Sequence, residues 1–377
     1  MILAAGTLSA TSLSAVQIGI GAIVPALRTH FDLSLAQIGV VLGATNAGMT
    51  LTLLPWGIVS DRIGERRAIA YGLTGSTFAL VVAGEVRSFA GLVLALACAG
   101  AFGASVNSAS GRAVMHWFGP EERGLALGIR QAAIPIGGFA GALVLPTLAS
   151  SSGVRAAFFA LAVNCAAWAA LAAVVLRERH VDEEIAEELV SPLRDPRMWL
   201  LCGASAFVLA GQLAMMGFVV LFLHDARGLS TAHAAFVLAA VQVGGAAVRI
   251  AVGRASDRLH RRIPLFRAVA TACGVALAAA AVLTHAPLVA LVPVLVVAGV
   301  LGMSWNGLSF TAAAEAAGPR RSGAAIGFQQ TVLGVGGIVA PLAFVAVLGA
   351  TSWRIAFAAS GACAVVGAAL LRPLRSL

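Results

Sequence analysis

The stretch Gly57-Ile-Val-Ser-Asp61-Arg62-Ile-Gly-Glu65-Arg66-Arg67 lies where a long apolar run gives way to arginines. A second version, Gly253-Arg-Ala-Ser-Asp257-Arg258-Leu-His-Arg261-Arg262, follows about half a chain length later. A repeat of this kind in an apolar chain indicates two related halves, as in many membrane transporters.

The composition indicates a lipid environment. Hydrophobic residues make up 60% of the 377 residues and charged residues 11%, whereas a soluble domain carries about 25% charged residues. The net charge of +9 comes from arginines in short clusters between apolar runs, which is typical of a membrane protein and excludes a nucleic-acid-binding domain. The five cysteines lie singly inside apolar runs, so we expect no disulfide, metal site or cofactor.

Apolar runs separated by charged or Gly/Pro-rich turns divide the chain into spans. A membrane-spanning helix needs about 20 apolar residues. We therefore predict an all-α polytopic membrane protein with twelve transmembrane helices in two pseudo-symmetric six-helix bundles. The predicted spans are 3–27, 35–59, 67–85, 89–116, 123–149, 154–176, 198–223, 232–255, 264–284, 287–315, 322–348 and 353–372.

One long polar stretch divides these spans six and six. We predict an N-terminal bundle (1–176), a charged cytoplasmic linker (177–197) and a C-terminal bundle (198–377). Residues match between the halves at one constant offset, among them Asn107 with Asn306 and Gln131 with Gln330. Because six spans separate the copies, both halves have the same orientation in the membrane.

Arginine placement predicts the orientation. With the N-terminus inside, far more arginines fall in cytoplasmic than in outer loops, so both termini are expected in the cytoplasm. The first residues lack a basic start and a cleavage site, and we expect them to begin the first span. We expect a monomer in a bacterial cytoplasmic membrane.

The first copy of the repeated stretch fits the pattern Gly-x-x-x-Asp-Arg-x-Gly-x-Arg-Arg at every position. This pattern resembles the loop between helices 2 and 3 of the major facilitator superfamily, and the resemblance covers nearly the whole chain. The second copy is one residue shorter and lacks the inner glycine. The resemblance implies two six-helix bundles that rock about a central cavity, and it implies no substrate, because one fold serves many.

The two aspartates of the repeat have a physical role of their own. Asp61 and Asp257 lie at predicted cytoplasmic helix ends, where a carboxylate can face the free amides at the N-terminus of helix 11 or helix 5. Such contacts, worth about 0.3–2 kcal/mol each, would close the inner side as a latch and break when it opens. The predicted gating residues are Gly57, Asp61, Arg62, Arg66, Asp257, Arg258 and Glu315.

Glu315 and His116 occupy equivalent positions at the ends of helices 10 and 4. We predict that Glu315 pairs with Arg258 in the latch. A proton-coupling role for Glu315 is the second interpretation, because acids within membranes often relay protons.

Three arginines fall inside spans, where a charge costs about 2.5 kcal/mol or more. Arg130 and Arg249 are predicted to hold a substrate anion, and the stretch from Arg249 to Asp257 is similar to helix 8 of monocarboxylate and oxalate/formate-type members. Arg112 either joins them or extends to the cytoplasmic surface. The polar residues predicted to complete the site are Gln17, Asn107, Gln131, Gln242, Asn306 and Gln330.

The leading hypothesis is a secondary transporter that moves a small, carboxylate-like organic anion by alternating access, with proton coupling as an option. The competing hypothesis is efflux of neutral or amphipathic drug-like metabolites by the same fold. The absence of an acid deep in helix 1 counts against cation export, and the absence of an acid beside Arg249 departs from the monocarboxylate pattern. A transport-inactive sensor or scaffold is a third hypothesis. The sequence offers no nucleophile–base pair that would indicate an enzyme.

Overall fold

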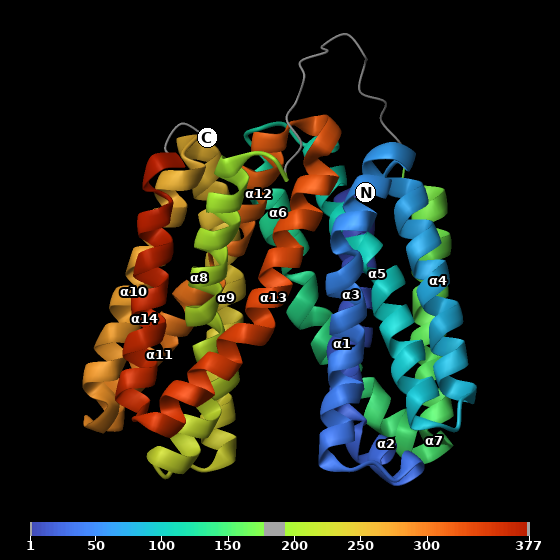
Figure 1. Ribbon diagram of the computed structural model, residues 1–377, viewed down its shortest axis with the longest axis horizontal. Coiled ribbons are helices and arrows are strands. Elements are labelled where there is room, and N and C mark those ends of the chain that lie inside the picture. The colour runs from blue at the N-terminus through green and yellow to red at the C-terminus, as the bar shows by residue number, and fades with distance from the viewer. Residues whose placement is uncertain (1, 177–192, 375–377) are drawn as a thin grey trace. The chain divides into compact units, whose positions relative to one another are not determined.

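The computed structural model describes residues 2–176 and 193–374, which are almost entirely helical (Figure 1). Most of the predicted linker, residues 177–192, lies outside the described residues. The α-helices are α1 (Ile2–Ala22), α2 (Val24–Phe31), α3 (Leu35–Ile63), α4 (Glu65–Glu85), α5 (Phe89–Trp117), α6 (Arg123–Gln131), α7 (Ala133–Val175), α8 (Pro196–Leu221), α9 (Thr231–Leu259), α10 (Arg262–Val282), α11 (Leu288–Met303), α12 (Asn306–Ala317), α13 (Ser322–Ala350) and α14 (Trp353–Leu370). Short π- or 3₁₀-turns cover Phe222–Ala226 (η1), Leu283–His285 (η2), Pro319–Arg321 (η3) and Arg372–Leu374 (η4).

The number of membrane spans agrees with the prediction. Eleven helical stretches of the described chain are long and apolar enough to cross a membrane. One of them, Arg123–Val175, has 53 residues and a break at Gly153, where φ is 84° and ψ is 167°. A helix cannot continue through those angles, so this stretch contains two spans, which gives the twelve predicted.

Three of the predicted spans are interrupted and do not form single continuous helices. The span 3–27 is divided between α1 and α2, and 123–149 is divided between α6 and α7. Pro25 and Pro135 follow these breaks closely, and proline lacks the N–H group that would continue the helix. The span 287–315 is divided at Ser304, whose hydroxyl donates instead to the carbonyl of Val300 at 2.6 Å, a contact that bends helices.

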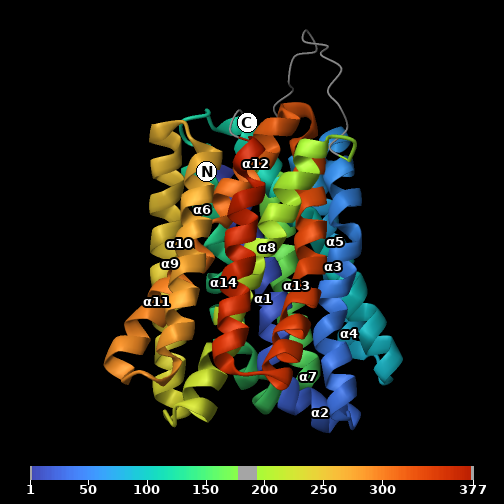
Figure 2. The same cartoon turned by 60° about the vertical axis from the view of Figure 1, so that its left-hand side comes forward.

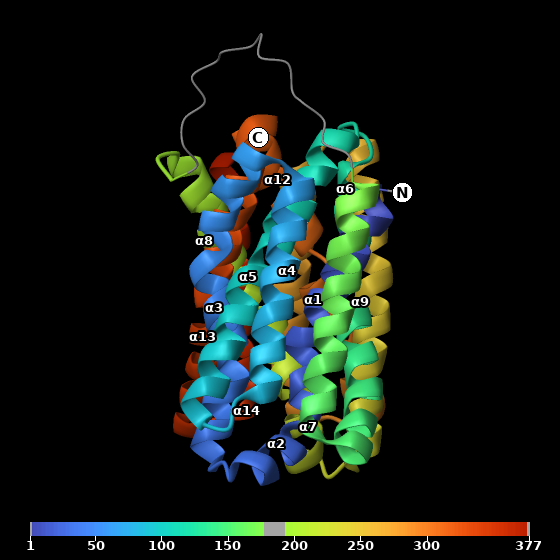
Figure 3. The same cartoon turned by 90° about the vertical axis from the view of Figure 1, so that its right-hand side faces the viewer.

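The described residues pack as two compact units, each taken here by itself. Unit 1 takes its residues from Met1–Gly119, Ile129–Pro192 and Ala317–Thr331. Within it α3 and α4 pack against α5, and α1 and α4 pack against α7 (Figure 3). Leu73, Leu96 and Phe158 are fully buried in its core. The start of α13 therefore belongs to the same unit as α3 and α5.

Unit 2 takes its residues from Pro120–Gly128, Leu193–Ala316 and Val332–Leu377. Within it α14 lies beside α8 and α10, and α11 packs against α9 and α10 (Figure 2). A group of aromatic side chains forms part of its core. Within this group the rings of Phe222 and Phe357 meet edge to face, with centroids 5.1 Å apart. The start of α6 belongs to this unit.

Several helix starts carry their own side-chain cap. Ser34 and Gln37 form a capping box at the start of α3, and Ser88, Ser230 and Ser352 each accept a backbone N–H at the start of α5, α9 and α14. Such serines satisfy amides that have no partner inside the helix. The starts of α6 and α13 are capped differently, by side chains from other helices.

Candidate functional site

The first amides of α13 are capped by Asp61, which lies in the last turn of α3. Its carboxylate accepts hydrogen bonds from the amides of Gly323 at 3.0 Å and Ala324 at 2.8 Å. The first four N–H groups of a helix have no partner within it, and the partial positive charge there favours a carboxylate. The predicted contact between Asp61 and helix 11 is therefore present.

Asp257, at the end of α9, caps α6 in the same way. It accepts hydrogen bonds from the amides of Gly124 at 2.8 Å and Leu125 at 2.7 Å. Both predicted aspartate–helix contacts are thus present, one inside each unit.

Glycines allow the backbones to approach at both contacts. A Cβ atom on Gly57 would lie 2.4 Å from the carbonyl oxygen of Gly323, and one on Gly253 would lie 2.4 Å from that of Gly124. A side chain at either position would push the helices apart. Gly57, one of the residues predicted to take part in gating, therefore lies at this contact, where it leaves room for the facing backbone.

The first cluster consists of Asp61, Glu65, Arg112 and His116. Arg112 forms an ion pair with Glu65, and its Nε lies 3.2 Å from Oδ1 of Asp61. Nδ1 of His116 lies 3.7 Å from Oε2 of Glu65, whose Oε1 accepts a hydrogen bond from Trp117 at 3.2 Å. The side chains of Glu65 and His116 are each 1% exposed.

This arrangement changes the interpretation of Arg112. The sequence placed it among the substrate ligands, or at the membrane surface. The structure places it between two carboxylates in a buried ion-pair cluster, where its charge is already balanced. We therefore remove Arg112 from the set of candidate substrate ligands.

The second cluster consists of Asp257, Arg262, Glu315 and Arg123. Arg262 pairs with Asp257, and its Nη2 lies 3.3 Å from Oε1 of Glu315 and donates to the carbonyl of Pro120 at 2.6 Å. Nη1 of Arg123 lies 3.9 Å from the same oxygen of Glu315.

The prediction that Glu315 pairs with Arg258 is wrong. Residues 258 and 262 are one helical turn apart in sequence, but Arg262 begins a new helix and its side chain is buried, whereas Arg258 is exposed. Arg62 and Arg66 of the first copy are exposed too, so neither of them is part of the first cluster.

Arg130 is a buried guanidinium among neutral partners. It lies in the last turn of α6, is 2% exposed, and donates to Oγ of Ser110 at 3.1 Å and to the carbonyl of Asn107 at 3.4 Å. Its Nε and the hydroxyl of Thr7 are buried without a hydrogen-bond partner among the described residues. In the part of the chain that the structure describes, no carboxylate forms an ion pair with Arg130.

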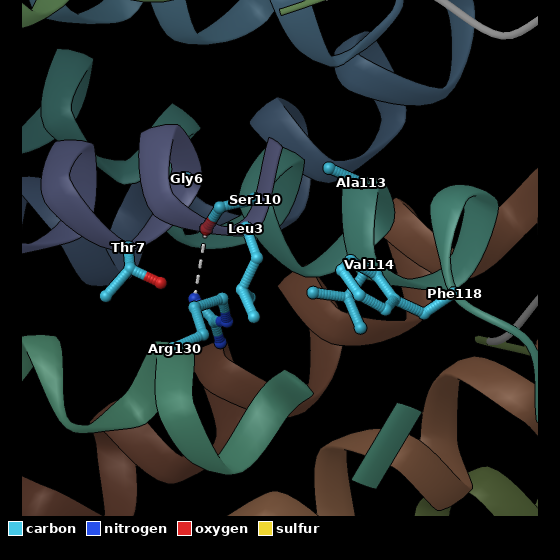
Figure 4. A pocket seen from close by; sticks show the side chains of 8 residues that line it. All are labelled: Leu3, Gly6, Thr7, Ser110, Ala113, Val114, Phe118 and Arg130. Atoms are coloured by element: carbon cyan, nitrogen blue, oxygen red, sulfur yellow. Dashed lines mark hydrogen bonds between the residues drawn. The ribbon is translucent and has the colours of Figure 1, made fainter. Parts of the chain in front are cut away.

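A small pocket lies beside Arg130 (Figure 4). It leaves no space for the centre of even a water-sized molecule, whereas typical ligand pockets enclose roughly 300–1,000 Å³. In Figure 4 the hydroxyl of Thr7 points toward the Arg130 guanidinium, which is hydrogen-bonded to Ser110. The pocket is too small to hold a substrate, and Arg130 is the only basic residue among those that line it. Its lining residues are Leu3, Gly6, Thr7, Ser110, Ala113, Val114, Phe118 and Arg130.

Arg249 is held at the break between α11 and α12. Its Nε donates to the carbonyl of Met303 at 2.9 Å, and its Nη2 to Oδ1 of Asn306 at 3.2 Å. The last carbonyls of a helix lack partners within it, so a guanidinium satisfies one of them here. Arg249 is 4% exposed, and Asn306, one of the polar residues predicted to complete the site, lies beside it.

The remaining predicted polar residues are dispersed. Gln17 donates to Asn46 within unit 1, and Asn107 places its amide 3.4 Å from the sulfur of Met49. Gln131, which follows Arg130 in the sequence, is buried. Gln242 and Gln330 each bury an amide atom that has no hydrogen-bond partner among the described residues.

Sequence reasoning left several residues out of the predicted sets. Glu65 and Arg262 were present in the quoted stretches, and each is the first residue of a helix, α4 and α10. His116 was recognised as the counterpart of Glu315 but was given no role. Ser110, which lies one turn along α5 from Asn107, carried no signal that would have distinguished it from other small residues.

The sequence matches the family model of the Major Facilitator Superfamily over residues 3–341. This chain belongs to the Major Facilitator Superfamily. It is 32% identical over 363 residues to the uncharacterized MFS-type transporter Rv2994 of Mycobacterium tuberculosis, covering 95% of this chain and 81% of that protein. It is 24% identical over 388 residues to the probable sulfoacetate transporter SauU of Cupriavidus necator, covering 93% and 88%.

The fold agrees with solved members of the superfamily. The proton:xylose symporter XylE aligns with a TM-score of 0.82 at 14% identity, covering 98% of this chain and 94% of that one. Such low identity shows the fold alone. The chain is thus a Major Facilitator Superfamily transporter that spans the membrane.

Proposed function

We propose that this transporter moves a small organic anion across the membrane as a secondary transporter. The observation that carries the proposal is Arg130. A guanidinium buried to 2% exposure, with a hydroxyl and a carbonyl as its partners, keeps its positive charge uncompensated in unit 1. A charge buried at membrane depth costs about 2.5 kcal/mol or more, so such residues are usually retained for a function.

The guanidinium group suits carboxylate and sulfonate substrates. Its planar N–H groups bind two oxygens of an acidic group side by side, which adds geometric selection to the charge. We assign the same role in unit 2 to Arg249, which lies at a helix break where backbone carbonyls are open to polar partners. The relative named for sulfoacetate, an anion with two acidic groups, supports this substrate class.

The two clusters supply the gating part of the proposal. In alternating access one side of a transporter closes while the other opens, and contacts on the closed side must break in each cycle. We assign this role to the hydrogen bonds from Asp61 to α13 and from Asp257 to α6. The arginine distribution supports a cytoplasmic position for both contacts and for both termini, and we propose a monomer in the cytoplasmic membrane.

The test is anion binding and transport by the purified full chain. Sulfoacetate and a series of mono- and dicarboxylates would be screened for thermal stabilisation, since a ligand of the folded state raises the melting temperature. Uptake of the best stabilisers would then be measured in proteoliposomes. We expect Arg130→Gln to weaken binding about tenfold or more, because a charge-assisted hydrogen bond is lost.

Arg87→Gln is the matched control, because Arg87 is an exposed arginine in the loop between α4 and α5. It should bind and transport like the parent chain. If no anion stabilises the protein and Arg130→Gln leaves transport of an amphipathic compound unchanged, the anion proposal is wrong. Efflux of neutral or amphipathic compounds would then be the better assignment.

A further inference from the structure

A groove runs along the exposed face of α10, apart from the sites described above. It offers about 500 Å³ of space, within the roughly 300–1,000 Å³ of typical ligand pockets. The opposite face of the helix is buried in unit 2, where α10 packs against α11 and α14 (Figure 1). The groove therefore opens toward the surroundings of the protein. The residues that line it, all exposed or half-exposed, are Pro264, Arg267, Ala268, Thr271, Ala272 and Val275.

The groove has the length of one leaflet of a bilayer. Its first and last lining residues are Pro264 and Val275, and their separation in sequence corresponds to about 16 Å along a helix. Half of the hydrocarbon core of a bilayer measures about 15 Å. Because α10 begins at Arg262, the groove starts near the polar end of the helix and ends near the middle of the predicted span. An extended acyl chain fits these dimensions.

Arg267 places a positive charge near the polar end of the groove. In the part of the chain that the structure describes, no carboxylate forms an ion pair with Arg267. Asp257 and Glu315 pair instead with Arg262. Three further arginines at this end of unit 2 are exposed, namely Arg254, Arg258 and Arg261. The groove therefore combines an apolar floor with a basic end, which is the pattern that recognises an anionic lipid headgroup.

Thr271 lies one helical turn beyond Arg267, toward the middle of the membrane. Thr77, Thr311 and Thr331 each donate to the carbonyl four residues earlier in their own helix. The hydroxyl of Thr271 has no hydrogen bond to any residue that the structure describes. A hydroxyl facing hydrocarbon is costly without a partner. The ester carbonyls of a phospholipid lie just below its phosphate, so one of them can accept this hydrogen bond when the phosphate binds Arg267.

The corresponding face of α4 in unit 1 carries larger side chains. Counted from the first residue of each helix, Tyr71 takes the position of Ala268, and Phe78 takes that of Val275. These two rings are 61% and 67% exposed, so they occupy the face that small side chains leave open on α10. Ala70 stands at the position of the groove's arginine. The basic groove is therefore a property of α10 and not of the internal repeat.

We propose that the groove on α10 binds one anionic phospholipid, with its phosphate on Arg267 and an acyl chain along Ala268, Ala272 and Val275. A zwitterionic lipid carries an additional ammonium group, which the exposed arginines repel. A second copy of the chain is a poorer occupant, because a two-fold interface would bring the same arginines face to face. The proposal goes beyond the transport function and depends neither on the transported anion nor on gating.

Native mass spectrometry of the purified full chain tests the site. The chain, in a neutral detergent, would be titrated with dioleoyl phosphatidylglycerol or with dioleoyl phosphatidylcholine, which have the same acyl chains. We expect the first phosphatidylglycerol to bind at least about fivefold more tightly, the effect of one basic residue beside an anionic lipid. Arg267→Gln should remove this preference. Arg66→Gln, at an exposed arginine in the first turn of α4, is the matched control and should keep it.

A second variant tests the apolar part of the groove. Ala268→Tyr combined with Val275→Phe gives α10 the rings that α4 carries, and it should weaken binding of both lipids to this site. The substituted side chains are exposed, so thermal unfolding without lipid should stay like that of the parent chain. Val282→Phe enlarges an exposed side chain of the same helix beyond the groove and should leave lipid binding unchanged.

Each outcome supports or overturns the lipid site. An unchanged preference in Arg267→Gln, an equal loss in Arg66→Gln, or parental binding in the double variant would overturn it. A dimer that dissociates in the double variant, without a preference for phosphatidylglycerol, would assign the groove to a second copy of the chain. If the double variant does not fold, Arg267→Gln decides. Failure of anion transport together with a normal lipid preference would refute the proposed substrate and leave the lipid site intact.

Discussion

Unit 1 begins α4 with a glutamate, Glu65, and unit 2 begins α10 with an arginine, Arg262. The ion-pair partner has the opposite sign in each case, Arg112 of α5 in unit 1 and Glu315 of α12 in unit 2. Both arrangements surround an aspartate that caps a helix. The duplication has therefore kept the carboxylate–amide contact and a neighbouring ion pair, whereas the pair is formed by residues of opposite sign in the two units.

The physical reason lies in what each position must achieve. The aspartate has to be a carboxylate, because the amides at a helix N-terminus are donors with partial positive charge. The flanking pair only has to balance charge, and either order of signs does so. A glutamate at the start of α4 also agrees with the dipole of its own helix, whereas an arginine at the start of α10 opposes it. Arg262 accordingly has more partners: Asp257, Glu315, Ser256 and the carbonyl of Pro120.

The largest expected effect comes from removing the arginine of each cluster. Arg112→Met leaves Glu65 and Asp61 buried without their main counter-charge and should lower the free energy of unfolding by about 3–5 kcal/mol. Arg262→Met should cost less, about 1–3 kcal/mol, because Arg123 remains beside Glu315. Denaturant titration in mixed micelles would measure both.

Two further variants complete this comparison. Arg66→Met, at an exposed arginine in the first turn of α4, should change stability by less than about 0.5 kcal/mol. Glu65→Met combined with Arg112→Met should recover much of the loss, since no buried glutamate is left unpaired. Equal losses for Arg112→Met and Arg262→Met would contradict the difference drawn between the units.

A second prediction concerns the feature that the units share. Gly57→Ala and Gly253→Ala should each destabilise by about 1–3 kcal/mol, because the new Cβ would lie 2.4 Å from a carbonyl oxygen. Gly43→Ala, on the same helix as Gly57, meets no atom within 4 Å and should be neutral or up to about 1 kcal/mol stabilising. Stability and amide exchange at α13 and α6 would be compared, and harmless alanines at both contacts would show that close approach is not required.

The smallest expected effect is at Glu315. Its side chain is 27% exposed, and its two arginine partners lie 3.3 and 3.9 Å away. Glu315→Gln should therefore cost under about 1 kcal/mol, as for most partly exposed pairs. Glu65→Gln, at a side chain that is 1% exposed, should cost clearly more in the same unfolding experiment. The reverse order would show that exposure does not decide the strength of these pairs.

The fold and the aspartate contacts could be predicted from the sequence because their signals are local or repeated. Long apolar runs mark the spans. The repeated stretch marks two equivalent helix ends, so Asp61 and Asp257 could each be matched with the start of another helix. The direction of the hydrogen bonds then follows from the polarity of the helix.

The ion-pair partners could not be predicted in the same way. Arg112 meets Glu65 only because α4 and α5 pack side by side, and a long side chain can reach several positions on a neighbouring helix. The choice of Arg262 over Arg258 for Glu315 depends on where α9 ends and α10 begins. The break at Ser304 lacks the proline that usually marks such an interruption, and it creates the carbonyl that Arg249 binds.

The glycine contacts have a kinetic consequence. Where Gly57 meets Gly323, and Gly253 meets Gly124, main chain lies against main chain, and the side chains beside the contact are polar ones such as the capping aspartates. Interlocked side chains would have to leave their rotamer minima each time two such surfaces separated, whereas bare backbone slides apart and rejoins without repacking. These glycine contacts therefore add little activation barrier of their own, which suits the gating role proposed for them.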